Sequence, residues 1–65
     1  MKGADLKRLL KKHGCHFLRE GGSHEFWYSN ISAAEFTVPR HDGQEVASGT
    51  LNKILKLAGI KSERG

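Results

Sequence analysis

The chain has 65 residues, which is enough for one domain at most, and a domain of this size buries only about 60% of the surface that its unfolded form exposes. A large internal pocket is therefore excluded, and a substrate is expected on the surface. Eleven Lys and Arg against seven Asp and Glu give a formal net charge of +4, which suits nucleic acid or an acidic partner protein. The single cysteine, Cys15, excludes an internal disulfide and favours an intracellular protein in which Cys15 is a small core residue.

The first predicted element is a helix over residues 4–13, ended by Gly14. One side of this helix carries residues at helical spacing that suit a core, namely Leu6, Leu9, Leu10 and His13. The other side is basic and carries Lys7, Arg8, Lys11 and Lys12. The N-terminal stretch has no apolar run typical of a signal peptide or a membrane span, which predicts a cytoplasmic protein without a membrane segment.

Residues 15–20 and 24–30 predict the two strands of a hairpin, with Gly21 and Gly22 suited to the positive φ angles of a tight turn between them. A third short strand is predicted over 35–39. In that third strand, Phe36 and Val38 share one face, and Pro39 ends the ladder because it has no N–H.

Side chains alternate along the second strand, so that one face carries His24, Phe26 and Tyr28 while the other carries Glu25, Trp27 and Ser29. We expect Phe26 to point into the core. Trp27, on the opposite face, is either a platform on which the bases of a single-stranded nucleic acid stack or a further core residue.

The stretch 50–59, TLNKILKLAG, predicts a second helix, capped at its start by Ser48 or Thr50 and ended by Gly59. Its apolar stripe consists of Leu51, Ile54, Leu55 and Ala58. Lys53 and Lys56 add charge to the outer side of this helix. At the edge of the stripe, Leu57 is either a partner contact or the margin of the core.

The predicted order is α-β-β-β-α, an α+β fold in which a three-stranded antiparallel sheet is covered on one face by two helices. Double-stranded-RNA-binding domains have the same order, although a shared fold alone does not give a function. We expect one domain over residues 1–65, with residues 61–65 as a frayed tail.

The four histidines, at positions 13, 16, 24 and 41, fit no metal-binding spacing, so we expect no metal site and no cofactor. His24 differs from the others because it is the first residue after the glycine turn, where side chains are accessible, and Ser23 beside it offers a hydroxyl. Imidazole exchanges protons at cellular pH, which makes His24 a candidate for acid-base catalysis. Position alone favours a structural or incidental role for His24 over a catalytic one. The basic helix face is typical of either a phosphate-binding surface or an ordinary solvated face.

Three segments resemble the signature blocks of HicA-type toxins, also described as YcfA-like mRNA interferases: GSH at 22–24, TVPRH at 37–41 and GTLNKILKLAGI at 49–60. The opening DLKRLLKKHG fits as well, so the resemblance covers nearly the whole chain. It implies a double-stranded-RNA-binding-domain-like fold, cleavage of mRNA, and neutralisation by a cognate HicB-type antitoxin. The histidine of the family's Gly-Ser-His block is catalytic, and that role falls on His24. One departure is SNISAAEF, which lacks the family's Pro-Asp-Gly turn between the second and third strands.

The resemblance leads us to expect a toxin of a type II toxin-antitoxin system, a metal-independent endoribonuclease in which His24 is the general base or acid. Cleavage of RNA needs a group to exchange protons, cations to stabilise charge on the phosphate, and contacts that position the strand. The expected RNA-binding residues are Lys7, Lys11, Lys12, Gly22, Ser23, Arg40 and His41. Of these, His41 is either a second proton-transfer group or a loop residue.

Charge complementarity favours an antitoxin that lays an acidic segment over His24 and the basic face of the first helix. The alternative function is a non-enzymatic RNA-binding module with the same fold. Such a module would bind any RNA duplex in a salt-sensitive manner and would release no cleavage products.

Overall fold

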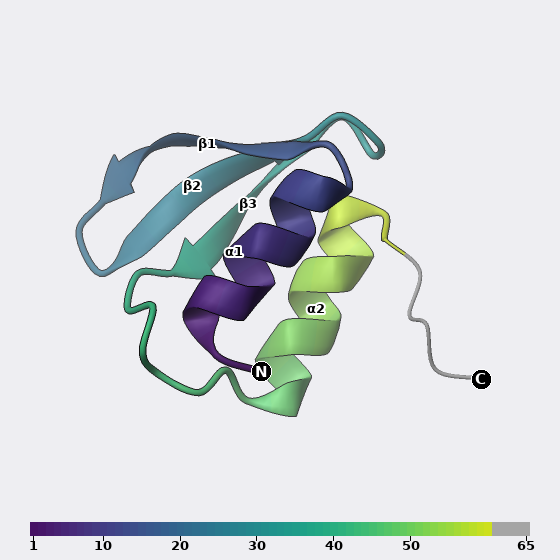
Figure 1. Ribbon diagram of the computed structural model, residues 1–65. Coiled ribbons are helices and arrows are strands. Elements are labelled where there is room, and N and C mark those ends of the chain that lie inside the picture. Colours follow the sequence, from purple (N-terminus) through teal and green to yellow (C-terminus); the bar gives the residue numbers. More distant parts are fainter. Residues whose placement is uncertain (61–65) are drawn as a thin grey trace.

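The structure is a computed structural model that describes residues 1–60, and the predicted frayed tail, residues 61–65, lies outside these described residues. Five elements follow one another: α1 (Gly3–Lys12), β1 (Cys15–Gly21), β2 (His24–Ser29), β3 (Ala34–Pro39) and α2 (Ser48–Ala58). The strands form an antiparallel sheet in the order β1-β2-β3, and both helices lie on one face of it (Figure 1). The predicted α+β fold is therefore confirmed. Neither helix is long and apolar enough to cross a membrane.

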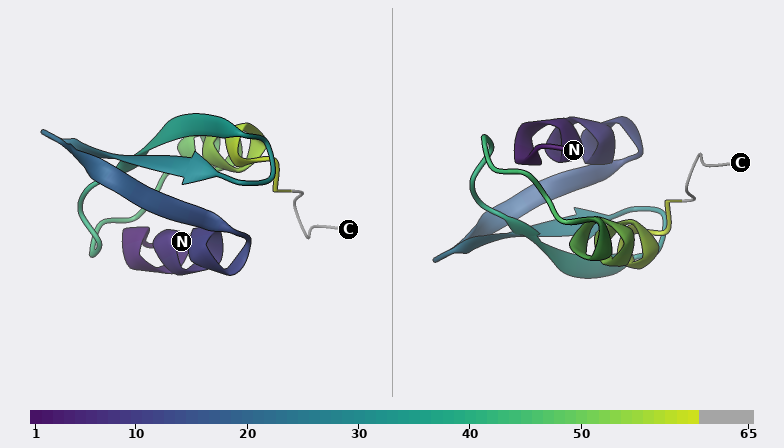
Figure 2. Two further views of the ribbon diagram at one scale, coloured as in Figure 1. Left: turned by 90° about the horizontal axis from the view of Figure 1, so that it is seen from above. Right: turned by 90° about the horizontal axis from the view of Figure 1, so that it is seen from below.

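The two helices cover different parts of the sheet, because α1 packs against β1 and α2 packs against β3 (Figure 2). Between the helices and the sheet lies one apolar core of buried residues, to which Leu51 and Leu55 add half-buried side chains. Its members are Leu6, Leu10, Cys15, Trp27, Phe36, Val38, Val46, Ile54, Ala58 and Ile60. The expected core role of Cys15 is confirmed, and Phe36 and Val38 share one face of β3 as predicted, which is the buried face.

Glycines end both helices as predicted. Gly14 follows α1 with a φ of +91°, and Gly59 follows α2 with a φ of +75°, a left-handed conformation that few other residues adopt without strain. The predicted cap of α2 is wrong. Ala47 occupies the N-cap without a side-chain hydrogen bond, because the helix begins at Ser48 and already contains Thr50.

The turn between β1 and β2 lies one residue later than predicted. Gly21 is still a strand residue, paired with His24, so that Gly22 and Ser23 form the turn. Only Gly22 has a positive φ, +71°, as is typical of a type II′ hairpin turn with glycine first. Gly21 is required for a different reason, because a Cβ there would collide with the ring of Phe26.

The face of β2 that meets the helices is the one opposite to our expectation. Trp27 is 1% exposed and belongs to the core, whereas Phe26 is half-buried on the other face. There the guanidinium of Arg19 lies 4.4 Å from the centre of the Phe26 ring and covers it. Burial also excludes the proposed stacking of bases on Trp27, whose Nε1 donates a hydrogen bond to Glu25 at 3.0 Å.

A polar network led by Lys7 joins α1, β2 and the segment after β3. The Lys7 ammonium donates to Glu25 at 3.1 Å, to Asp42 at 2.5 Å and to the Arg40 carbonyl at 3.0 Å. The side chains of Lys7 and Glu25 are each only 13% exposed. The network therefore satisfies a nearly buried carboxylate and fixes the segment that follows β3 against α1.

The network shifts the pKa values of two members. Burial by itself lowers the pKa of Lys7, but the hydrogen bonds to Asp42 and Glu25 and their charges outweigh it, so the pKa is raised above 10.5. The hydrogen bond from Lys7, and then its charge, lowers the pKa of Asp42 below 3.8. By linkage, the Asp42 contribution to stability is present above its unfolded pKa and is lost as the pH falls through its lower folded pKa. The Lys7 contribution is present below 10.5 and is lost as the pH rises through the raised value.

The connection between β2 and β3 is organised by Ser29, although it lacks the family's usual turn sequence. The fully buried Ser29 hydroxyl donates to the Ala58 carbonyl at 2.6 Å and accepts from the amides of Ile31 and Ser32 at 3.1 and 3.3 Å. Ala33 completes the turn with a φ of 55°. This hydroxyl therefore ties the turn to the last residue of α2.

We expect Ser29→Ala to lower the free energy of unfolding by about 1–3 kcal/mol, because the Ala58 carbonyl and the turn amides lose a buried partner. The control is Ser32→Ala, which removes an exposed hydrogen bond to the Leu57 carbonyl and should cost under about 1 kcal/mol. Urea unfolding of both variants measures the difference. Equal losses would show that Ser29 does not organise the turn.

Lys7→Gln is expected to lower the free energy of unfolding at pH 7 by about 1–2 kcal/mol, since Glu25 is left without its cation. The difference from the wild type should shrink as the pH falls below 3.8, where Asp42 becomes protonated and no longer attracts Lys7. Lys11→Gln is the control, because Lys11 has no ion pair within residues 1–60, and it should stay within about 0.5 kcal/mol. A difference that is independent of pH would contradict this account.

Candidate active site

His24 is the first residue of β2, next to the glycine turn, and its side chain is exposed. The backbone of His24 pairs with Pro39 of β3 on one side and with Gly21 of β1 on the other. The hydroxyl of Ser23 lies 3.1 Å from Nδ1 of the His24 ring, within hydrogen-bonding distance. One ring nitrogen is thus held by the turn, which leaves Nε2 for contact with a substrate.

Arg40, directly after β3, reaches across to the same turn. One guanidinium nitrogen donates to the Gly22 carbonyl at 2.9 Å, and the other lies 3.4 Å from the Glu20 carboxylate. These contacts hold a cation beside Gly22, Ser23 and His24. Four of the residues expected to bind RNA or catalyse its cleavage therefore lie together at one end of the sheet.

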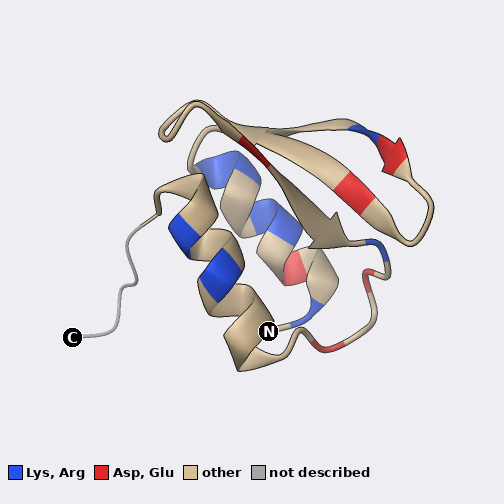
Figure 3. Cartoon of the chain, turned by 180° about the vertical axis from the view of Figure 1, so that it is seen from behind, with Lys and Arg blue, Asp and Glu red and all other residues tan. Residues whose placement is uncertain are grey.

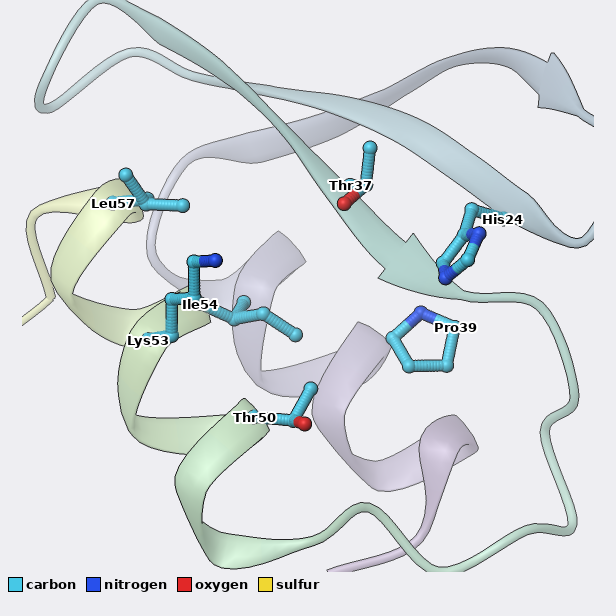
Figure 4. A pocket seen from close by; sticks show the side chains of 7 residues that line it. All are labelled: His24, Thr37, Pro39, Thr50, Lys53, Ile54 and Leu57. Carbon is cyan, nitrogen blue, oxygen red and sulfur yellow. The ribbon is translucent and has the colours of Figure 1, made fainter.

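A surface pocket of about 180 Å³ begins at His24 and extends toward α2 (Figure 4). It is lined by His24, Thr37, Pro39, Thr50, Lys53, Ile54 and Leu57. The pocket forms because β3 is an edge strand whose Thr37 and Pro39 point to the same side as His24, while α2 packs along that strand. It is smaller than the roughly 300–1,000 Å³ of sites that enclose a drug-sized ligand, and it suits a small part of a longer molecule.

The lining residues from α2 were not predicted as site residues. Positions 50, 53, 54 and 57 follow helical spacing and form a stripe that adjoins the apolar one and shares Ile54 with it. The helical pattern that predicts the core therefore also groups these four residues on one side of the helix. Only the packing of α2 along β3 shows that this stripe faces His24. Leu57, left open between partner contact and core margin, is 43% exposed at the rim of the pocket.

The other expected RNA-binding residues lie elsewhere. Lys7 is committed to the network with Glu25 and Asp42. Lys11 and Lys12 are exposed in the last turn of α1 and do not line the pocket. His41 is exposed in the loop after β3, where its carbonyl accepts from the Gln44 amide at 3.3 Å. The structure thus gathers the turn residues with Arg40 and separates them from the basic face of α1.

The remaining histidines have their own surroundings. His16 lies on β1 with its ring centre 5.5 Å from that of Tyr28, and His13 is half-buried after the end of α1. Among residues 1–60, no group of three His, Cys, Asp or Glu side chains is placed to hold a metal ion.

Comparison with known proteins gives a family match over nearly the whole chain. The model of the HicA toxin of bacterial toxin-antitoxin systems matches residues 3–60, which include both helices, all three strands and His24. Neither the curated proteins nor the solved structures searched contain a match. Membership of this family implies a cognate antitoxin as partner. The chain belongs to the HicA toxin family of bacterial toxin-antitoxin systems.

Proposed function

We propose that this toxin is an endoribonuclease that cleaves mRNA with His24 as its proton-transfer residue and without a metal ion. The observation that carries the proposal is the exposed imidazole of His24 at the end of the pocket, beside the turn that Arg40 contacts. Membership of the HicA family supports a toxin, and the position of the Gly-Ser-His block supports the choice of residue.

In the proposed reaction, the RNA supplies the nucleophile, which is its own 2′ hydroxyl. The 2′ oxygen attacks the neighbouring phosphorus, the bond to the 5′ oxygen breaks, and one proton leaves the attacking hydroxyl while another joins the departing oxygen. His24 performs one of these two transfers. A hydroxyl at Nδ1 orients its ring, so that Nε2 faces the linkage.

Arg40 and the backbone of the turn stabilise the negative charge that builds up on the phosphate. The guanidinium has five N–H donors, and its contacts with Gly22 and Glu20 leave others available. The amides of Gly22 and Ser23 lie in the same turn and can help to orient a phosphate. The proposal assigns RNA binding to these residues first. More distant parts of the RNA strand are left to Lys11, Lys12 and His41.

We further propose that the antitoxin is of the HicB type and that an acidic segment of it covers His24 and the basic face of α1. The excess of Lys and Arg on the two helices supports an acidic partner (Figure 3). Covering the proton-transfer group and the phosphate-binding cations together would block both binding and chemistry.

The test is cleavage of a mixed-sequence single-stranded RNA in the presence of EDTA. The wild type should cut, and His24→Ala should lose about 10²- to 10⁴-fold in rate, as expected for one acid-base group. His16→Ala is the matched control, because His16 is also an exposed strand histidine but lies outside the pocket. A His24→Ala variant that cuts like the wild type would remove His24 from the mechanism. If the wild type and His24→Ala both bind RNA and neither cuts it, the chain is an RNA-binding module.

His41→Ala distinguishes the two roles left open for that residue. We expect a fall in cleavage rate well short of the roughly 10²- to 10⁴-fold of a general acid or base, because His41 does not line the pocket and its backbone holds the loop. Single-turnover cleavage of the same RNA measures the effect. A loss as large as that of His24→Ala would make His41 the second proton-transfer group.

A further inference from the structure

Within residues 1–60, every carboxylate already has a cationic partner. The ion pairs are Asp5 with Arg8, Glu20 with Arg40, Glu25 and Asp42 with Lys7, Glu35 with Arg19, and Glu45 with the N-terminal amine. The cations without such a partner in this part of the chain are Lys2, Lys11, Lys12, Lys53 and Lys56. No carboxylate in this part of the chain offsets the charge of these lysines, whereas Arg40 beside the turn shares its charge with Glu20.

Among these lysines, only Lys53 lines the pocket that contains His24. It belongs to α2, which has no acidic residue along its length, so no neighbour on the helix neutralises its charge. His24 comes from β2 and Lys53 from α2, with Thr37 and Pro39 of β3 between the two elements (Figure 4). An anion in this pocket therefore has a proton-transfer group on one side and a permanent positive charge on the other.

Two further residues of the lining suit a phosphate of a single strand. The hydroxyls of Thr37 and Thr50 are hydrogen-bond donors that accompany Lys53 around the pocket. Ile54, next to Lys53 in sequence, is 3% exposed and anchors this turn of α2 in the core. Lys53 is thus attached to a rigid element, which fixes its backbone beside the pocket.

We propose that Lys53 is a substrate-binding residue of the active site and that it holds the phosphate of the RNA linkage on which His24 acts. This inference rests on the proposed function, because it adds a residue of α2 to the same active site. Negative charge on the phosphate oxygens increases as the 2′ oxygen attacks, so Lys53 binds the transition state more strongly than the ground state. Arg40 flanks the turn, and Lys53 closes the pocket from the opposite side.

The test compares Lys53→Ala with Lys56→Ala, which removes an equal charge one turn further along α2 from an exposed position outside the pocket. Cleavage of single-stranded RNA should fall roughly 10- to 100-fold in kcat/KM for Lys53→Ala, somewhat less than the loss of an enclosed oxyanion donor. Lys53→Arg should recover part of the rate, because the charge is restored, and Lys56→Ala should stay close to the wild type. Equal effects of Lys53→Ala and Lys56→Ala on kcat/KM would overturn the proposal.

A binding measurement separates this proposal from the proposed function. In the His24→Ala background, where RNA stays intact, adding Lys53→Ala should weaken binding of the same RNA and reduce the slope of log Kd against log salt by about 0.7, the value for one phosphate of a single strand. Adding Lys56→Ala should change the slope less. If the wild type cuts no RNA, the proposed nuclease function fails, while this comparison still decides whether Lys53 binds phosphate. The proposal would be overturned if Lys53→Ala left the salt slope of RNA binding unchanged and weakened only the binding of the antitoxin. That result would assign Lys53 to the protein interface.

Discussion

The burial of Trp27 decides which face of β2 meets the helices, and the position of the candidate site follows from it. Since side chains alternate strictly along a strand, a buried Trp27 directs Glu25 toward the helices as well and places Phe26 and His24 on the outer face. His24 still lines the pocket with α2, because the pocket lies at the edge strand β3, where Thr37 and Pro39 share the outer face with His24. The inward carboxylate then requires a cation, and Lys7 of α1 supplies it. Because Lys7 also binds Asp42 and the Arg40 carbonyl, the same network fixes the segment that brings Arg40 to the turn beside His24. The fold and the site are therefore joined through a few neighbouring side chains.

Much of this architecture could be predicted from local sequence, and the errors concern contacts between distant residues. Helical spacing and glycine stops identified both helices, and the turn before His24 identified the exposed histidine. The buried face of β2 was predicted wrongly because Phe26 and Trp27 are both large and apolar, so local pattern does not choose between them. That choice depends on Arg19 and Gly21, which accommodate Phe26 on the outer face, and on Glu25, which accepts the Trp27 N–H. Lys53 was missed for a similar reason, since only the packing of α2 along β3 brings it to the pocket.

The ion pairs divide the cations into those whose charge a carboxylate offsets and those whose charge is not offset. Lys7, Arg19 and Arg40 are engaged with carboxylates of the strands and of the loop after β3. The excess positive charge lies on α1 and α2 (Figure 3). Lys11 and Lys12 of α1 face open solvent, whereas Lys53 of α2 shares a pocket with the proposed proton-transfer group. An acidic antitoxin segment would be attracted by the same charges that attract RNA, so inhibition and substrate binding are expected to compete.

RNA is proposed to bind where β2, β3 and α2 meet, with its phosphate between His24 and Lys53. The most direct measurement is a nuclear magnetic resonance titration of the His24→Ala variant with an intact single-stranded RNA, followed through the backbone amides. We expect the largest shifts at the amides of Gly22, Ser23 and Thr37 and along the 50–57 stretch of α2. Shifts confined to α1 around Lys11 and Lys12, with the amides around the pocket unchanged, would contradict this proposal.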